Sequence, residues 1–185
     1  MSDLSPGVTI VELDPADSDA REQAAQIMHA AFPHWTATIE DARQQVELSV
    51  DPERICLTAR ASDDILGWIG GMPQYSHAWE LHPLVVRADA RRQGIGRALV
   101  AALESRLRER EVLTLYLGTD DEGPTAGTTA WGIDLFPDPL AHATRLRSID
   151  HAAGFYQQLG FVVIGLIPDA NGPGKPDILM AKRVG

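Results

Sequence analysis

The stretch Arg91-Arg92-Gln93-Gly94-Ile95-Gly96-Arg97-Ala98 lies between a predicted strand, Ala78 to Val86, and a predicted helix, about Ile95 to Glu109. Glycines let a turn bring successive backbone N–H groups together without obstruction by a Cβ atom. The start of a helix adds N–H groups without an intrahelical acceptor and a partial positive charge. Because such a turn suits a diphosphate, the stretch predicts a pyrophosphate-binding loop.

Other glycine-rich loops fit this stretch less well. A P-loop requires Lys and then Ser or Thr after its last glycine, whereas Arg97 and Ala98 follow Gly96 here. A dinucleotide-binding fingerprint needs a further glycine or alanine at the position of Leu99. An ordinary helix start that contains glycine remains the alternative to a phosphate-binding loop.

The elements around the loop predict an α/β protein. After the helix comes a strand, Val112 to Gly118, and this order is typical of a right-handed crossover between parallel strands. Upstream, periodicity predicts a strand at Val8 to Leu13 and helices at Asp17 to Phe32 and Thr38 to Ser49. It also predicts a hairpin whose two strands are Arg54 to Arg60 and Ile65 to Met72. Downstream, we expect a long loop, Thr119 to Asp150, with room for a short helix, then a helix at Ala152 to Leu159 and strands at Phe161 to Ile167 and Ile178 to Arg183.

Length and composition indicate one soluble domain, residues 1–185, because 44% hydrophobic and 23% charged residues are typical of globular proteins. No apolar run approaches the roughly 20 residues that span a bilayer, so we expect no membrane partner. Met1 to Asp14 has no signal-peptide pattern, which favours the cytoplasm. Cys56 is the only cysteine and lies in an apolar run, which predicts a buried structural thiol. The net charge of −10 argues against nucleic-acid binding and allows a cationic partner.

The loop also carries a family resemblance. Arg91, Gly94 and Gly96, followed by an apolar helix, resemble the acetyl-CoA pyrophosphate loop of the GNAT superfamily of acyltransferases. The resemblance implies the GNAT fold: a mixed, mostly antiparallel central sheet, splayed between two parallel strands and flanked by helices. It implies acetyl-CoA as cosubstrate. The implied contact residues are Leu84, Val85, Val86, Arg91, Arg92, Gln93, Gly94, Ile95, Gly96, Arg97 and Tyr156.

Longer stretches narrow the resemblance to aminoglycoside 6'-N-acetyltransferases. These stretches are Pro73-Gln74-Tyr75, Trp79 to Val86, Tyr116 to Asp121, Phe155 to Phe161 and Ile167 to Ile178. The similarity weakens from Glu122 to Asp150. The resemblance to aminoglycoside 6'-N-acetyltransferases implies direct acetyl transfer to the 6'-amine of an aminoglycoside in a ternary complex. It also implies antibiotic resistance and a homodimer. Two alternatives stay open: a GNAT enzyme for another small-molecule or protein amine, and a non-catalytic acetyl-CoA-binding module.

The strand before the loop holds the candidate catalytic residues. Pro83 cannot donate a ladder hydrogen bond, which predicts a bulge or break in the strand. The resemblance implies that the Leu84 N–H polarises the thioester carbonyl and that Val86 pairs with pantetheine. The two-residue period of a strand places Glu80 and His82 on one face.

An amine with a pKa of about 10.4 must lose a proton before it can attack. Glu80 is our candidate to bind the ammonium and to accept its proton directly or through water, with a salt-bridged surface glutamate as the alternative. His82 is either a second base or a hydrogen-bonded strand histidine. By resemblance, Tyr156 protonates the leaving thiolate, and ring packing is the alternative.

Substrate binding is expected at acidic and aromatic residues. Asp120 and Asp121 follow a predicted strand and could attract a polycation, or they could stabilise a turn. Trp35 and Tyr75 could form walls for sugar rings, or pack in a core or interface. Four further histidines show no spacing typical of metal ligands, so we expect no metal: His29, His34, His77 and His142.

Overall fold

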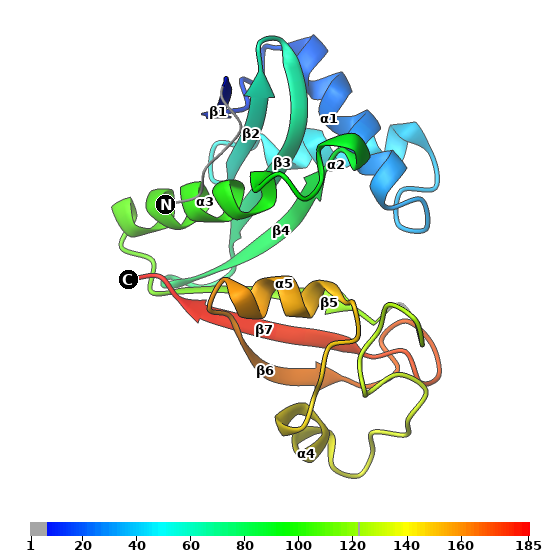
Figure 1. The fold of residues 1–185 in the computed structure, drawn as a ribbon. Coiled ribbons are helices and arrows are strands. Elements are labelled where there is room, and N and C mark those ends of the chain that lie inside the picture. The colour runs from blue at the N-terminus through cyan, green and yellow to red at the C-terminus, as the bar shows by residue number, and fades with distance from the viewer. Residues whose placement is uncertain (1–6, 122) are drawn as a thin grey trace. The chain divides into compact units, whose positions relative to one another are not determined.

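A computed structural model of the protein describes residues 7–121 and 123–185 (Figure 1). The chain divides into two compact units, Met1–Leu113 with Gly185 and Thr114–Val184. Each unit combines an antiparallel sheet with helices, in agreement with the predicted α/β class. That residues 1–185 act as a single domain remains a prediction.

The first unit contains four antiparallel strands in the order of the sequence. They are β1 (Val8–Glu12), β2 (Ile55–Ala61), β3 (Asp64–Pro73) and β4 (Ala78–Val86). The predicted hairpin is β2–β3, and Ser62 in its turn has a φ of 54°. Buried residues alternate along β4 with partly exposed ones, and Glu80 and His82 share the partly exposed set. The predicted common face of these two side chains is therefore confirmed.

Two capped helices pack over this sheet. Helix α1 (Ser18–Ala31) begins after Asp17, whose carboxylate accepts the Ala20 N–H. Helix α2 (Ile39–Ser49) begins with a capping box, in which Thr38 and Asp41 bond each other's backbone N–H groups. Such caps satisfy donors that have no partner inside the helix.

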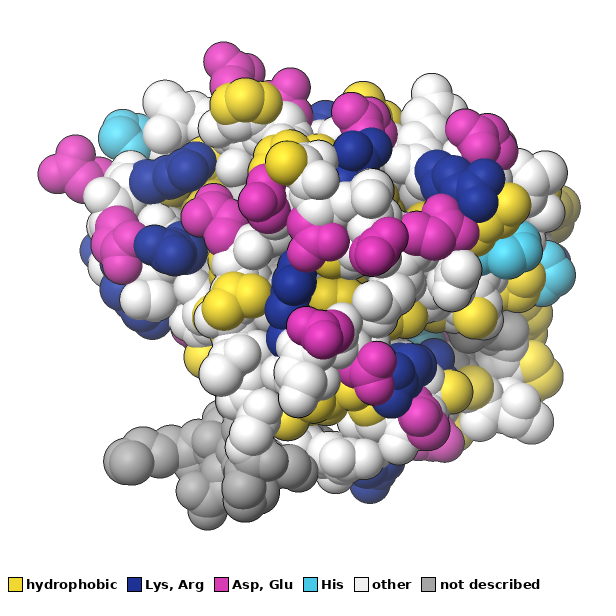
Figure 2. Space-filling view, turned by 90° about the horizontal axis from the view of Figure 1, so that it is seen from above, with side chains coloured by type: hydrophobic (Ala, Val, Ile, Leu, Met, Phe, Trp, Pro, Cys, Tyr) yellow, Lys and Arg dark blue, Asp and Glu magenta, His cyan; other side chains and the backbone are white. Residues whose placement is uncertain are grey.

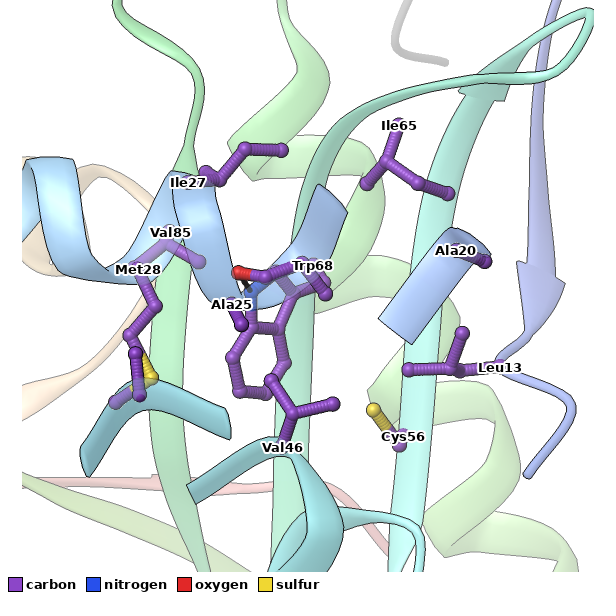
Figure 3. Packing of buried hydrophobic residues seen from close by; sticks show 12 residues of the cluster. Leu13, Ala20, Ala25, Ile27, Met28, Val46, Cys56, Ile65, Trp68 and Val85 are labelled. Carbon is purple, nitrogen blue, oxygen red and sulfur yellow. Dashed lines mark hydrogen bonds between the residues drawn. The ribbon is translucent and has the colours of Figure 1, made fainter. Parts of the chain in front are cut away.

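The core of this unit lies between α1, α2 and the strands (Figure 3). Trp68 is fully buried there, and its indole N–H donates to the Ala24 carbonyl at 3.0 Å. Cys56 is buried in the same core, and burial raises the pKa of its thiol to about 12. The predicted structural thiol is confirmed.

Helix α3 (Ile95–Glu109) has the predicted boundaries, and a short 3-10 helix, η1 (Ala88–Ala90), precedes it. The leucines at spacings of four are all fully buried: Leu99, Leu103 and Leu107. Leu103 fills the space beside Gly71 of β3, where an added Cβ would lie 2.8 Å from its side chain. The apolar face of α3 thus packs on the sheet of the first unit.

The second unit contains strands in the order β5-β7-β6, with antiparallel neighbours. Its elements are β5 (Thr114–Asp120), α4 (Pro139–Thr144), α5 (Ala152–Gln158), β6 (Val162–Ile167) and β7 (Asp177–Arg183). Gly160 follows α5 with a φ of 90°, as expected for a helix C-terminus. In its described residues the long loop contains one short helix, α4, and Thr128 pairs with Ser148 in an isolated bridge.

Ion pairs join acidic and basic side chains on the surface of the first unit. Arg43 contacts Glu22 and Glu40, and Arg60 contacts Asp17. On the face shown in Figure 2, magenta and dark blue side chains are interspersed. Each helix within residues 7–121 and 123–185 is too short or too polar to span a bilayer.

Candidate active site

Strand β4 contains a bulge at the predicted position. His82 and Pro83 together face Gly70 of β3, because Leu84 pairs with Ile69 and Leu81 pairs with Gly71. The bulge brings the His82 carbonyl oxygen against Gly70, where a Cβ atom would collide with it. The sequence signal at Pro83 is thus confirmed, and a glycine on the neighbouring strand makes room for it.

Glu80 lies next to the end of the β3–β4 hairpin. Its carboxylate accepts a hydrogen bond of 3.1 Å from the side-chain amide of Gln74. The backbone N–H groups of Gln74 and Tyr75 both donate to the Ala78 carbonyl, which closes the turn. Glu80 is half-buried, so one carboxylate oxygen is held by Gln74 while the group remains accessible. No pattern in the sequence linked Gln74 to Glu80.

His82 lies beside Trp35, with ring centroids 4.7 Å apart and an edge-on angle of 60°. Burial lowers the pKa of His82, Glu80 opposes this effect, and Arg54 adds to it. The imidazole is therefore neutral at neutral pH, as a proton acceptor must be. Trp35 remains 42% exposed, so part of its side chain is open to solvent.

The loop between β4 and α3 has the backbone expected of an anion cradle. Arg92 and Gly94 have φ values of 65° and 80°, and Gly94 caps α3 without a side-chain hydrogen bond to the helix N-terminus. Left-handed backbone conformations at alternate residues turn successive N–H groups toward one point. Arg91 donates from Nε to the Val86 carbonyl at 3.2 Å, and Gln93 donates to the Asp89 carbonyl at 3.1 Å. These side-chain bonds hold the loop.

The loop residues also have the right exposure for a phosphate ligand. The exposed members are Arg91, Arg92, Gln93, Gly94 and Arg97, while Gly96 is partly exposed and Ile95 is buried. The guanidinium groups add positive charge to the helix N-terminus, which favours an anion. The residues present therefore fit a diphosphate group. On β4, the side chain of Val85 is buried in the core, whereas Leu84 and Val86 are partly exposed.

The two aspartates after β5 have different environments. Asp121 is buried, and its carboxylate accepts the Thr128 N–H at 3.1 Å and the Thr128 hydroxyl at 2.6 Å. This arrangement supports the turn-stabilising alternative for Asp121. Asp120 is exposed, and its carboxylate accepts from the Asn171 amide at 2.6 Å. Of these two aspartates, Asp120 is therefore the one that presents a carboxylate suited to a solvent-borne cation.

Tyr156 is buried in the second unit between two phenylalanines. Its ring lies 5.2 Å from Phe155 and 5.5 Å from Phe161, both edge-on. Burial raises the pKa of the hydroxyl, so it remains protonated at neutral pH. The helix that carries it, α5, is capped by His151, which also donates from Nε2 to the Asp120 carbonyl at 2.7 Å. No pattern in the sequence pointed to this histidine.

Tyr75 lies at the tip of the β3–β4 hairpin and is 71% exposed. An exposed aromatic ring can contact a ligand, so the environment is compatible with a substrate wall. Within the described part of the chain, no three His, Cys, Asp or Glu residues are grouped to hold a metal ion.

Comparison with known proteins identifies the family. The model of the acetyltransferase (GNAT) family matches residues 21–126, which include β4, the glycine loop and α3. The chain therefore belongs to the GNAT family of acetyltransferases and has the fold that the glycine loop predicted. No relative was found among the curated proteins.

Solved structures give a more specific similarity. An aminoglycoside 6'-N-acetyltransferase complexed with coenzyme A is 35% identical, with a TM-score of 0.89, over 96% of this chain and 97% of that one. The aminoglycoside 6'-N-acetyltransferase from Enterococcus faecium is 36% identical over the same shares, with a TM-score of 0.87. The ribosomal-protein-S18-alanine N-acetyltransferase from Escherichia coli is 21% identical over 96% and 94%, with a TM-score of 0.65, and shares the fold.

Proposed function

We propose that this enzyme transfers the acetyl group of acetyl-CoA to the 6'-amine of aminoglycosides and thereby confers resistance to them. The observation that carries the proposal is the identity of 35% with an aminoglycoside 6'-N-acetyltransferase over 96% of the chain. The half-buried pair Glu80 and His82, on the strand that leads into the glycine loop, supplies residues suited to proton removal. We also propose that the protein acts in the cytoplasm.

The glycine loop binds the cosubstrate in this proposal. Backbone N–H groups of residues 91–97 and the guanidinium groups of Arg91, Arg92 and Arg97 bind the diphosphate. Acetyl-CoA supplies an activated acetyl group as a thioester. The N–H of Leu84 stabilises negative charge on the thioester oxygen, and the backbone of Val85 and Val86 aligns the pantetheine arm.

Proton transfer is assigned to β4. Glu80 binds the substrate ammonium and accepts its proton, directly or through water, so that the free amine can attack. Gln74 orients the Glu80 carboxylate by donating a hydrogen bond to it. His82, held neutral by burial, can accept the same proton as a second base. In this proposal Tyr156 returns a proton to the departing thiolate, and its hydroxyl is protonated at neutral pH.

Charge and aromatic groups account for substrate choice. An aminoglycoside is a polycation, which the net charge of −10 attracts and the exposed carboxylate of Asp120 can bind. Asp121 contributes indirectly, since its bonds to Thr128 hold the loop that follows Asp120. Trp35 and Tyr75 offer exposed ring faces to the sugars.

A homodimer through the second unit is part of the proposal. Strand β6 lies at the edge of its sheet, and Val162, Ile164 and Ile167 expose 61%, 51% and 45% of their surface. Exposed apolar edge strands are surfaces that a second copy can cover. Light scattering at micromolar concentration should report a dimer, and a monomer would contradict this part of the proposal.

The deciding experiment measures release of the coenzyme A thiol from acetyl-CoA. Kanamycin, an analogue with a hydroxyl at its 6' position, and spermidine serve as acceptors. We expect turnover with kanamycin alone, which would also fix the 6' position as the site of transfer. Turnover with spermidine alone would replace the substrate by another amine. No turnover with any acceptor would favour a binding module.

A further inference from the structure

The loop after α1 holds Trp35 in a fixed position. The N–H groups of Trp35 and Thr36 both donate to the Phe32 carbonyl, at 3.1 and 2.8 Å, and the Thr36 hydroxyl donates to the same oxygen at 2.9 Å. His29 of α1 donates from Nδ1 to the Thr36 carbonyl at 2.8 Å. Thr36 is completely buried. These hydrogen bonds fold the backbone of this short loop into a tight turn.

Aromatic contacts connect this loop to β4. Phe32 packs edge-on against Trp35 with centroids 5.7 Å apart, and Trp35 packs edge-on against His82 at 4.7 Å. Edge-on ring pairs within about 4.5–7 Å are attractive beyond the area that they bury. The ring of His82 is therefore held from the side of the α1 loop.

Charged groups on β4 and just before β2 also act on His82. Glu80 lies two residues away on β4 and favours the imidazolium, whereas Arg54, just before β2, disfavours it. On the α1 side, the Nδ1 of His29 is used by the Thr36 carbonyl. Burial has the largest effect on the pKa of His82, because a half-buried imidazole loses hydration that the charged form needs.

We propose that Trp35 is a positioning residue for His82: its indole fixes the imidazole ring and excludes water from it. This role differs from that of a substrate wall, which would act on the amine and leave His82 unchanged. The catalytic consequence rests on the proposed function, whereas the effect on His82 can be measured in the protein alone.

The test is an NMR titration of the His82 imidazole, assigned by its loss in His82→Gln. In the unaltered protein, we expect His82 to titrate below its ordinary value of 6.5. Trp35→Ala should bring the midpoint up towards 6.5, and Trp35→Phe, which keeps a ring, should have a smaller effect. Leu48→Ala, which removes a side chain of similar exposure on α2, should leave the titration unchanged. A midpoint that is identical in folded Trp35→Ala, or in folded Trp35→Phe if the alanine variant does not fold, would overturn the inference.

Kinetics separate the two roles of Trp35. A positioning role predicts that Trp35→Ala lowers kcat by about tenfold, a part of the 10²–10⁴-fold that a well-placed base contributes. The KM for acetyl-CoA should remain unchanged. A raised KM for the amine with unaltered kcat and unaltered His82 titration would show a substrate wall only and overturn the inference. If no amine is acetylated by the unaltered protein, the proposed function fails, but the His82 titration still decides the inference.

Discussion

The side-chain amide of Gln74 donates a hydrogen bond of 3.1 Å to the carboxylate of Glu80. These residues lie diagonally across the β3–β4 hairpin, whose turn is closed by two N–H groups donating to the Ala78 carbonyl. The bond therefore ties the proposed base to a rigid turn. A directional hydrogen bond to a carboxylate restricts the rotation of that group.

Gln74→Met, which keeps the length of the side chain but removes the donor, should lower kcat about fivefold to tenfold, in line with roughly 1–1.5 kcal/mol for such a bond at a partly exposed site. Steady-state kinetics in a double-mutant cycle with Glu80→Gln provide the measurement. The effect of Gln74→Met should vanish when Glu80 is already replaced. An equal loss in both backgrounds would show that Gln74 acts elsewhere. Ser76→Ala, in the same turn, is the control and should retain full activity.

A second prediction concerns the bulge. Gly70→Ala should reduce the free energy of unfolding by about 1–3 kcal/mol, because the added methyl group would collide with the His82 backbone. Urea unfolding measures the loss. Gly165→Ala is the matched control, since a Cβ there would make an ordinary contact of 3.9 Å with Leu179. Equal effects of the two substitutions would mean that the bulge does not require Gly70.

Local signals in the sequence predicted the parts of the fold that depend on neighbouring residues. Pro83 predicted the bulge, and Gly94 with Gly96 predicted the start of α3. The contact between Trp35 and His82 could not be predicted in this way, because it joins a loop to a strand and follows no periodicity. The difference between Asp120 and Asp121 was also hidden. It depends on Thr128, which lies seven residues after Asp121 in the long loop.

Replacement of these adjacent aspartates should have different effects on stability and on substrate binding. Asp121→Ala should lower the free energy of unfolding by about 2–3 kcal/mol, because it leaves the buried Thr128 N–H and hydroxyl without their partner. Asp120→Ala should leave stability within about 0.5 kcal/mol, as is usual for exposed positions, and raise the KM for a polycationic amine. Thermal unfolding and steady-state kinetics on both variants test the pair. A large stability loss at Asp120 would contradict the assignment.

The lowered pKa of His82 predicts how stability depends on pH. Since the folded state disfavours the imidazolium, the unfolded state binds more protons as the pH falls through 6.5, the ordinary pKa of histidine. The free energy of unfolding should therefore fall on acidification through 6.5 and level off below the folded pKa of His82. Urea unfolding between pH 8 and pH 5 should show a smaller decline for His82→Gln. Identical declines in the two proteins would show that His82 does not contribute.

The glycine loop gives the most direct test of cosubstrate binding. Gly96 lies in the first turn of α3, whose first turn contains no acidic residue and whose N-terminus has no side-chain cap. Gly96→Asp would place a negative charge and added bulk where N–H groups and arginines attract a diphosphate, so acetyl-CoA binding should weaken at least about 100-fold. Calorimetry with acetyl-CoA measures the affinity, and Gly96→Ala separates bulk from charge. Because an aspartate in the first turn favours the helix itself, a folded variant with weakened binding would locate the diphosphate at this loop. Unchanged affinity would place the cosubstrate elsewhere.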